Sequence, residues 1–152
     1  MKIVTFDESY QKDFKRLNEE WIMEYFFIEE NDKKALDFPQ QNIIEKGGFI
    51  RLAELDNEIV GACALMKVSE KVYELAKMGV TKKAQGKKVG DGLMAAMLQV
   101  AREQDCEKIL IYTSSILTPA IKLYEKYGFQ HVEVTEEKNY YARCDTKMEL
   151  NL

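Results

Sequence analysis

A strand-like run that ends near Val80 is followed by a helical pattern that begins near Val89 or Gly90, and the connection has residues suited to holding an anion. Glycines lie in or beside this connection: Gly86, Gly90 and Gly92. Glycine lets the backbone turn several N–H groups toward one point, and a helix N-terminus adds unsatisfied N–H groups and a partial positive charge. The spacing therefore predicts an anion-binding loop at the start of the helix.

The connection is basic within a chain whose formal net charge is −4. No Asp or Glu occurs between Leu75 and Gly90, whereas lysine is frequent: Lys77, Lys82, Lys83, Lys87 and Lys88. This excess of positive charge favours phosphate as the anion. A solvated connection with ordinary surface lysines is the competing interpretation. The Gly-Lys-Ser/Thr of a Walker motif and the strict Gly-x-Gly-x-x-Gly of a dinucleotide fingerprint are both absent.

Hydrophobic periodicity predicts the elements that must position this loop. Strands are expected at 3–6, 49–55, 59–68, 73–80, 108–112, 129–134 and 140–150. Helices are expected near 10–21, 32–44 with a break at Asp37-Phe38-Pro39, from 89 or 90 onward, and 120–127. Asp56-Asn57 indicates a hairpin turn. The order predicts an α/β (α+β) fold with a mixed, mostly antiparallel sheet of about six to seven strands and helices on both faces.

The whole-chain composition fits one globular domain, residues 1–152. The cysteines, Cys63, Cys106 and Cys144, are too widely spaced for a metal motif and odd in number, so we interpret them as reduced thiols of a cytoplasmic protein. The N-terminus lacks a signal peptide, and no run approaches the roughly 18 apolar residues of a membrane span. We therefore expect no membrane as a partner. The negative net charge argues against a nucleic acid as a partner.

Residues 73–94 resemble the acyl-CoA-binding motif of the GNAT superfamily of N-acetyltransferases, Arg/Gln-x-x-Gly-x-Gly/Ala. Gln85 matches its first position and Gly90 its last, while Lys88 stands where the first glycine usually stands. A second segment, Pro119 to Phe129, is similar to the family's Ala-x-x-Leu-Tyr-x-x-x-Gly-Phe. The resemblance covers roughly residues 48 to 135 and implies a GNAT-like fold.

The resemblance implies direct transfer of an acetyl (acyl) group from acetyl-CoA to a primary amine in a ternary complex. No cluster of residues in the sequence suggests a metal. Leu117 replaces an asparagine that is common three residues before Ala120, and Ser114 or Thr118 is the candidate substitute. The residues implied to contact the cofactor are Met78, Gly79, Val80, Gln85, Gly86, Lys87, Lys88, Val89, Gly90, Asp91, Gly92, Ser114, Ala120 and Tyr124.

Two side chains are candidates for proton transfer. Tyr124 matches the family tyrosine that reaches the cofactor sulfur, so it is the candidate acid. Glu74 is the candidate base, since its position relative to Gln85 resembles that of the catalytic Glu in histone-acetylating members. Strand alternation predicts one face that holds Glu74, Ala76, Met78 and Val80. Four strand residues span roughly 13 Å, so Glu74 needs a water or a bulge to act near Met78. A structural carboxylate is the alternative.

The acceptor is left open as a small-molecule or peptide amine. The N-terminal helices interleave acidic and aromatic residues, which suits either a cationic amine or a solvated acidic face: Glu19, Glu20, Trp21, Glu24, Tyr25, Phe26, Phe27, Glu29 and Glu30. A catalytically weak or inactive acyl-CoA-binding module is the alternative function. The last predicted strand, 140–150, is a candidate for pairing with a second subunit in a homodimer.

Overall fold

A computed structural model of the chain describes residues 1–134 and 141–152. Its strands and helices, in chain order, are β1 (Lys2–Thr5), α1 (Gln11–Tyr25), α2 (Glu30–Asp37), β2 (Phe49–Leu55), β3 (Glu58–Ser69), β4 (Val72–Val80), α3 (Val89–Glu103), β5 (Lys108–Thr113), α4 (Thr118–Lys126), β6 (Gln130–Val132) and β7 (Thr146–Asn151). Short helical turns occur at Glu8–Tyr10, Gln40–Ile44 and Lys82–Ala84.

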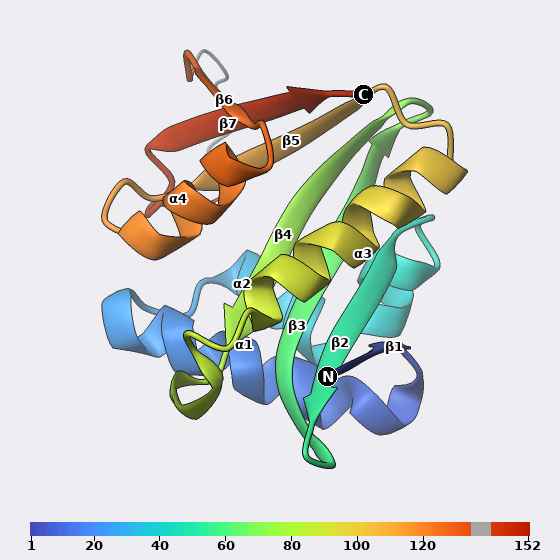
Figure 1. The fold of residues 1–152 in the computed structure, drawn as a ribbon, viewed down its shortest axis with the longest axis vertical. Helices are drawn as coiled ribbons and strands as arrows, with labels where there is room; N and C mark the ends of the chain where they lie inside the picture. Colours follow the sequence, from blue (N-terminus) through green and yellow to red (C-terminus); the bar gives the residue numbers. More distant parts are fainter. Residues whose placement is uncertain (135–140) are drawn as a thin grey trace.

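The strands form a seven-stranded sheet in the order β1-β2-β3-β4-β5-β7-β6 (Figure 1). Every neighbouring pair is antiparallel except β4 and β5, which are parallel and joined through α3. A parallel pair needs such a crossover, because the chain must return to the starting edge of the sheet. The predicted mixed, mostly antiparallel sheet is confirmed.

Helices cover both faces of the sheet and bury two separate cores. α1 and α2 pack over one face, where α1 contributes apolar residues at helical spacing: Phe14, Leu17 and Ile22. α3 covers the opposite face and contributes Leu93, Met94 and Met97 (Figure 1). Each such side chain stabilises the fold by about 1.5–3 kcal/mol when it is fully buried. The two helical layers thus hold the sheet, and with it β4, between them.

Two local features agree with the sequence interpretation. Asp56 and Asn57 both adopt left-handed backbone, with φ of 51° and 65°, as a two-residue hairpin turn between twisted strands requires. The second helix stops at Asp37 and resumes only as the turn Gln40–Ile44, since the residue before Pro39 has left the helical region.

β4 carries a β-bulge at Lys77, whose φ of 52° is left-handed. Ala76 lies opposite Ala64 of β3, but Gly79 lies opposite Ala62, so β4 has one residue more than β3 over this stretch. An extra residue reverses the side-chain alternation of the strand beyond it. The bulge therefore decides which side chains and N–H groups face each way near the end of β4.

The prediction of one shared face along β4 is wrong beyond this bulge. Met78 and Val80 pack into the core under α3, on the same side as Leu75. Gly79 faces α1 instead, and a Cβ there would come within 2.7 Å of Trp21. Met78 and Val80 are consequently not on the face that the alternation rule assigns to them together with Glu74.

The C-terminal part of the chain also differs from the prediction. The predicted strand 140–150 starts only at Thr146, and residue 140 lies outside the described residues. Just before β7, the Asp145 carboxylate accepts hydrogen bonds from the N–H and hydroxyl of Ser115, at 2.8 and 2.7 Å. β7 lies between β5 and β6, so its edges are both occupied, and it is not the edge strand that pairing with a second subunit requires. β6 is shorter than the predicted 129–134.

Candidate active site

β4 and β5 pair only from Val72 to Glu74 and then diverge. Beyond that point, among residues 1–134 and 141–152, β4 pairs only with β3, and β5 pairs only with β7. A cavity of about 570 Å³ lies in the divergence. Its lining comes from α1, the end of β4, the loop that follows, the start of α3, β5 and α4. The two parallel strands therefore separate toward the point where the predicted anion loop begins.

The loop before α3 has a backbone conformation that glycine favours. Gly86 and Lys88 have φ of 80° and 64°, and Lys88 immediately precedes the helix. A residue with a Cβ costs about 1–2 kcal/mol in this region, which accounts for the glycine that usually occupies the position of Lys88. The side-chain amide of Gln85 donates to the Val80 carbonyl at 3.2 Å and ties the loop to the end of β4.

The first turn of α3 leaves backbone donors without helical acceptors. Its first internal hydrogen bond runs from the Gly92 N–H to the Lys88 carbonyl, at 3.1 Å. The N–H groups of Val89, Gly90 and Asp91 precede this bond and have no carbonyl one turn earlier within the helix. All three residues line the cavity. The geometry meets the requirement for an anion site at a helix start.

The positive charge around the loop is smaller in the folded chain than the local sequence indicates. Glu24 of α1 pairs with Lys82 at 2.6 Å, and Glu58 pairs with Lys83. These carboxylates come from distant parts of the sequence, so a count over neighbouring residues misses them. Lys88 lines the cavity and is exposed, which makes it the loop lysine best placed to meet an anion there.

Asp91 would repel an anion at the helix start if its charge were unopposed. Its carboxylate pairs with Lys126 and accepts a hydrogen bond from the Tyr127 hydroxyl at 3.1 Å. The Lys126 contact lowers the pKa of Asp91, so the group is ionised but partnered. Asp91 therefore lines the cavity at the helix start while its charge is balanced from α4.

Most residues predicted to contact the cofactor line the cavity: Met78, Gly79, Val80, Gln85, Gly86, Lys88, Val89, Gly90, Asp91, Ala120 and Tyr124. Lys87, Gly92 and Ser114 do not. A Cβ at Gly92 would come within 2.3 Å of the terminal methyl group of Met1, whose flexible and exposed side chain would have to move. Ser114 is buried and its hydroxyl accepts from the Ile116 N–H, whereas Thr113 and Leu117 line the cavity nearby. Cofactor contacts of these residues stay predictions.

Two backbone donors of β4 point toward the open side of the strand. The Thr81 N–H donates to the Val60 carbonyl of β3 at 2.9 Å. N–H groups of an antiparallel strand alternate in direction, so the Gly79 N–H also faces β3, and the N–H groups of Val80 and Met78 face away from it. β5 has diverged at this level, and Met78 lines the cavity.

Tyr124 of α4 lies in the wall of the cavity with 7% of its surface exposed. Its ring packs against Phe129 at 6.2 Å between centroids. Burial raises the pKa of the phenol above its ordinary value, so the hydroxyl keeps its proton at neutral pH. A protonated phenol at this place can donate to a departing anion.

Glu74 precedes the bulge and does not line the cavity. Burial raises its pKa to about 7, and the charge of Lys77 opposes this increase. Among the described residues, no hydrogen bond is made to its carboxylate. A carboxyl group with this pKa changes charge near neutral pH, which suits a base, but contact with a ligand in the cavity requires an intervening water.

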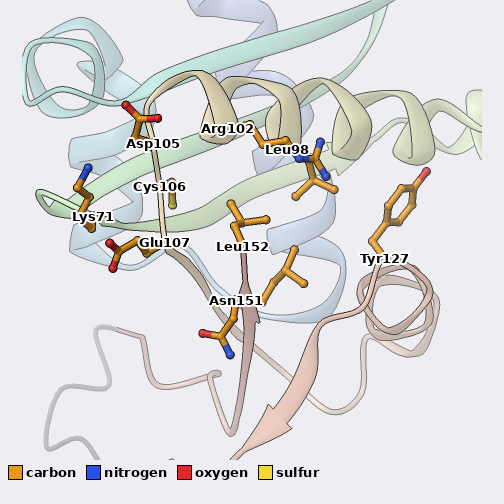
Figure 2. Close-up of a pocket in the computed structure, with 10 residues that line it drawn as sticks. Lys71, Leu98, Arg102, Asp105, Cys106, Glu107, Tyr127, Asn151 and Leu152 are labelled. Carbon is orange, nitrogen blue, oxygen red and sulfur yellow. The ribbon is translucent and has the colours of Figure 1, made fainter.

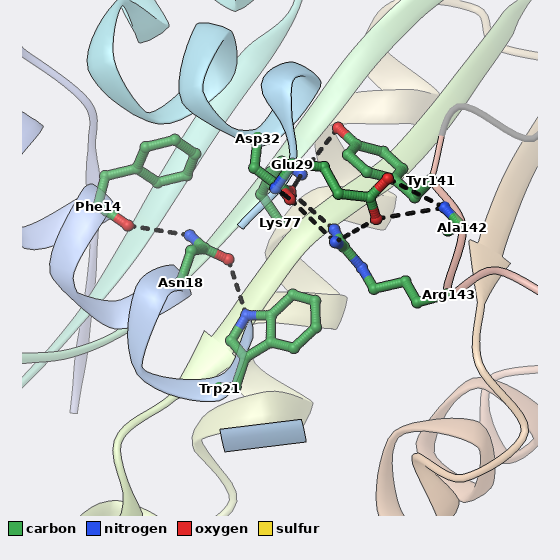
Figure 3. Close-up of polar contacts among 9 residues, drawn as sticks. All are labelled: Phe14, Asn18, Trp21, Glu29, Asp32, Lys77, Tyr141, Ala142 and Arg143. Carbon is green, nitrogen blue, oxygen red and sulfur yellow. Dashed lines mark hydrogen bonds and ion pairs between the residues drawn. The ribbon is translucent and has the colours of Figure 1, made fainter. Parts of the chain in front are cut away.

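A buried cluster of charges surrounds Lys77, which lines the cavity (Figure 3). The carboxylate of Asp32, which is fully buried, accepts from the Lys77 ammonium at 2.7 Å and from both terminal nitrogens of Arg143 at 2.7 and 2.9 Å. Burial alone raises the pKa of Asp32, but the hydrogen bonds from Arg143 and the charge of Lys77 outweigh it and hold the pKa at about 2. Lys77 also donates to the Tyr141 hydroxyl at 2.9 Å.

Sequence reasoning misses this cluster, since it treats Lys77 as one of several loop lysines. The partners are far apart along the chain: Lys77 and Asp32 are 45 residues apart, and Asp32 and Arg143 are 111 apart. A weak signal exists in the sequence, because Lys77 is a lysine between apolar strand residues. Such a residue is buried only with a partner of opposite charge.

The α1 side of the cavity is aromatic. Trp21 and Tyr25 lie one helical turn apart on α1 and line the cavity. The indole N–H of Trp21 donates to the fully buried Asn18 at 3.0 Å, which fixes the ring, and Arg143 lies over that ring at 5.5 Å (Figure 3). The glutamates of α1 and α2 are absent from the cavity lining. Glu20, Glu24 and Glu29 instead contact the loop after β4 or the segment 142–143.

A second hollow of about 800 Å³ lies at the opposite end of β5 (Figure 2). It is lined by the turn before β4, the end of α3, the loop before β5, the residue after α4 and the last residues of the chain: Lys71, Leu98, Arg102, Asp105, Cys106, Glu107, Tyr127, Leu150, Asn151 and Leu152. None of the residues predicted for catalysis or cofactor binding belongs to this lining.

A model of the acetyltransferase (GNAT) family matches residues 14–129. The chain therefore belongs to the GNAT acetyltransferase family, as its two motifs predict. A mycothiol acetyltransferase of Sanguibacter keddieii is 35% identical over 96 residues, which cover 59% of this chain and 30% of that protein. An N-acetylaspartate synthetase of Xenopus tropicalis is 32% identical over 101 residues, 66% of this chain and 37% of that protein. The chain thus spans about a third of the length of these relatives.

Solved structures share the fold at lower sequence identity. A GNAT acetyltransferase of Staphylococcus aureus Mu50 superposes with a TM-score of 0.89 at 20% identity, over 99% of this chain and 98% of that chain. The PaiA N-acetyltransferase of Thermoplasma acidophilum, solved with coenzyme A, has a TM-score of 0.77 at 15% identity and full coverage of both chains. The predicted GNAT-like fold is confirmed.

The structure also bears on metal binding, membrane spans and disulfides. Across residues 1–134 and 141–152, no group of three or more His, Cys, Asp or Glu side chains could hold a metal ion. No helix in the same part of the chain is long and apolar enough to cross a membrane. The cysteines, Cys63, Cys106 and Cys144, are free and buried.

Proposed function

We propose that this domain transfers an acetyl group from acetyl-CoA to a primary amine within a ternary complex. The observation that carries the proposal is the cavity between the diverging strands β4 and β5, with a helix N-terminus at one end and the buried Tyr124 in its wall. Acetyl-CoA, when bound, supplies an activated acyl group as its thioester. Family membership and the location of the sequence motifs support this assignment.

The loop and α3 hold the pyrophosphate in this proposal. The N–H groups of Val89, Gly90 and Asp91 are donors, and Lys88 adds a positive charge. Charge-assisted hydrogen bonds of this kind contribute about 1.5–3 kcal/mol each. The open edge of β4 holds the extended pantetheine arm through backbone hydrogen bonds, in the manner of strand addition. The absence of a β5 partner along Met78–Val80 supports this role.

Three groups divide the chemical work. The Met78 N–H polarises the acyl carbonyl, the Tyr124 hydroxyl gives a proton or a hydrogen bond to the departing sulfur, and Glu74 accepts the proton of the amine through water. The raised pKa of Tyr124 supports the donor role, and the pKa of about 7 for Glu74 supports the base role. We further place the protein in the cytoplasm, an assignment that the buried free thiols support.

The acceptor is proposed to be a small-molecule or peptide amine that enters beside Trp21 and Tyr25. The two curated relatives are named for different products, so their names do not select one acceptor. Aromatic rings with Arg143 stacked on one of them favour an acceptor that is not strongly cationic.

Release of free CoA thiol from acetyl-CoA, measured across a panel of amines, tests this function. At least one amine should give turnover, and Tyr124→Phe should lower kcat by about 10²-fold with little change in KM for acetyl-CoA. The rate should rise with pH through about 7 and level off above it, and Glu74→Gln should remove this dependence. CoA binding without turnover on any amine would favour the inactive binding module instead.

A further inference from the structure

Lys77 combines properties that are individually unfavourable. Its backbone is left-handed at φ 52°, which costs about 1–2 kcal/mol for a residue with a Cβ. Its ammonium is buried, with 3% of the side chain exposed, and burial lowers its pKa. Local backbone preference therefore does not explain why a lysine occupies this bulge on the wall of the cavity. The explanation must lie in the contacts of its side chain.

The bulge at Lys77 determines where the Met78 N–H points. With the extra residue, Gly79 stands opposite Ala62 and its N–H faces β3. Without it, the register would place Met78 opposite Ala62, and the Met78 N–H would be used in pairing with β3. The bulge therefore releases this donor into the cavity.

The Lys77 side chain ties the bulge to two other elements (Figure 3). Its ammonium donates to Asp32 of α2 at 2.7 Å and to the Tyr141 hydroxyl at 2.9 Å, and it lies over the Tyr141 ring at 4.2 Å. Asp32 is itself held by Arg143 and by the Glu29 N–H at 2.9 Å. The bulge is thus anchored to the α1–α2 side of the domain and to the segment before β7 at the same time.

Stability alone does not account for such an arrangement. A buried ion pair is commonly no more stabilising than apolar side chains of the same volume, because both charges lose their hydration. α2 has a second ion pair, between Asp37 and Lys15 of α1, with the same 2.7 Å separation but substantially exposed side chains, 36% and 40%. The exposed pair ties α2 to α1 only, whereas the buried pair ties α2 to the bulge.

We propose that Lys77 is a positioning residue of the transfer reaction: its ion pair with Asp32 and its hydrogen bond to Tyr141 hold the bulge that aims the Met78 N–H at the acyl carbonyl. The inference rests on the proposed function, because it requires acetyl-CoA in this cavity. Lys77 itself need not touch the ligand.

Carbon-13 NMR of acetyl-CoA labelled at the acetyl carbonyl tests the proposal, because a hydrogen bond to this oxygen moves the resonance downfield. The wild type should show a downfield shift on binding. Lys77→Met and Lys77→Gly should each lose at least about half of that shift and about tenfold or more in transfer rate, with the Kd for CoA within about threefold. Lys77→Gly relieves the backbone strain, so it separates the tether from the conformational preference.

Lys15→Met is the matched control and should retain the shift and the rate, since it removes only the exposed pair. Tyr141→Phe removes one anchor without exposing a buried charge and should lose a smaller part of the shift. Retention of the full shift and rate in folded Lys77 variants would overturn the proposal. If both Lys77 variants fail to fold, an unchanged shift in Tyr141→Phe overturns it. No acetyl-CoA binding by the wild type would instead overturn the proposed function.

Discussion

The two walls of the cavity hold charge in different ways. The wall formed by the loop and α3 presents backbone N–H groups and the exposed Lys88 to solvent. The opposite wall includes Lys77, whose ammonium is already paired with Asp32 in a buried cluster that also contains Arg143. An open set of donors can receive an anion, whereas a closed set can only fix the position of the elements that it joins. We therefore propose that the first, open wall binds the anion and that the second, closed wall positions the elements around it.

Two lysines, one on each wall, show the same difference between open and paired charge. Lys77 and Lys88 both have left-handed backbone, at φ 52° and 64°. Lys77 is buried and its ammonium donates to Asp32 and Tyr141, while Lys88 is exposed at the helix start. The conformational penalty of Lys77 is offset inside the protein by its ion pair with Asp32. The conformational penalty of Lys88 can be offset by a bound phosphate.

The largest expected effect concerns the closed wall. Asp32→Asn leaves the charges of Lys77 and Arg143 buried without a counter-ion, so it should lower the free energy of unfolding by about 3–5 kcal/mol. Asp37→Asn, which breaks the exposed pair with Lys15, should cost less than about 1 kcal/mol. Urea denaturation of both variants measures the two losses in the free energy of unfolding. Equal losses would show that burial of the pair is unimportant.

Glu74 should make stability depend on pH. Burial raises its folded pKa from 4.5 to about 7, so the folded state holds a proton that the unfolded chain releases earlier. The contribution of the Glu74 proton to the free energy of unfolding is therefore complete below pH 4.5, and it is lost as the pH rises through about 7. Glu74→Gln mimics the neutral form and should raise the free energy of unfolding at pH 8 by at most about 3 kcal/mol.

The same difference between Glu74→Gln and the wild type should shrink toward zero at pH 4.5. Denaturation at both pH values checks the sign. A gap that is equally large under acidic conditions would mean that the Glu74 carboxyl is not the titrating group.

On the open wall, Lys88→Glu reverses a charge beside the proposed pyrophosphate and should weaken CoA binding by about tenfold, which corresponds to about 1.4 kcal/mol. Lys12→Glu on α1 changes the net charge equally and should have less than a twofold effect. The two Kd values at low salt measure the difference. Equal weakening by both variants would assign the effect to net charge alone.

The smallest effect is expected for Lys88→Gly. Glycine relieves the left-handed strain of about 1–2 kcal/mol but adds freedom to the unfolded chain worth about 0.5–1 kcal/mol. The variant should therefore be more stable by roughly 0.5–1 kcal/mol in thermal unfolding, whereas Lys77→Gly should be less stable. Destabilisation by Lys88→Gly would indicate contacts of the Lys88 side chain that support the fold.

The contrast between the walls also explains what the sequence could predict. The open wall lies in one contiguous segment, so glycines, lysines and helix periodicity were enough to locate it, and Tyr124 followed from a second contiguous motif. The closed wall joins Asp32, Lys77 and Arg143, whose meeting depends on tertiary packing. The bulge is likewise invisible to an alternation rule, because one inserted residue reverses every face beyond it.

Calorimetric titration of the wild-type protein with CoA and with pantetheine tests the central claim most directly. The two ligands share the extended arm and the thiol, but only CoA has the pyrophosphate and the nucleotide. If the N–H groups at the start of α3 hold the pyrophosphate, CoA should bind at least about 10²-fold more tightly than pantetheine, and added salt should reduce the difference. Equal affinities for the two ligands, or no CoA binding at millimolar concentration, would contradict the account.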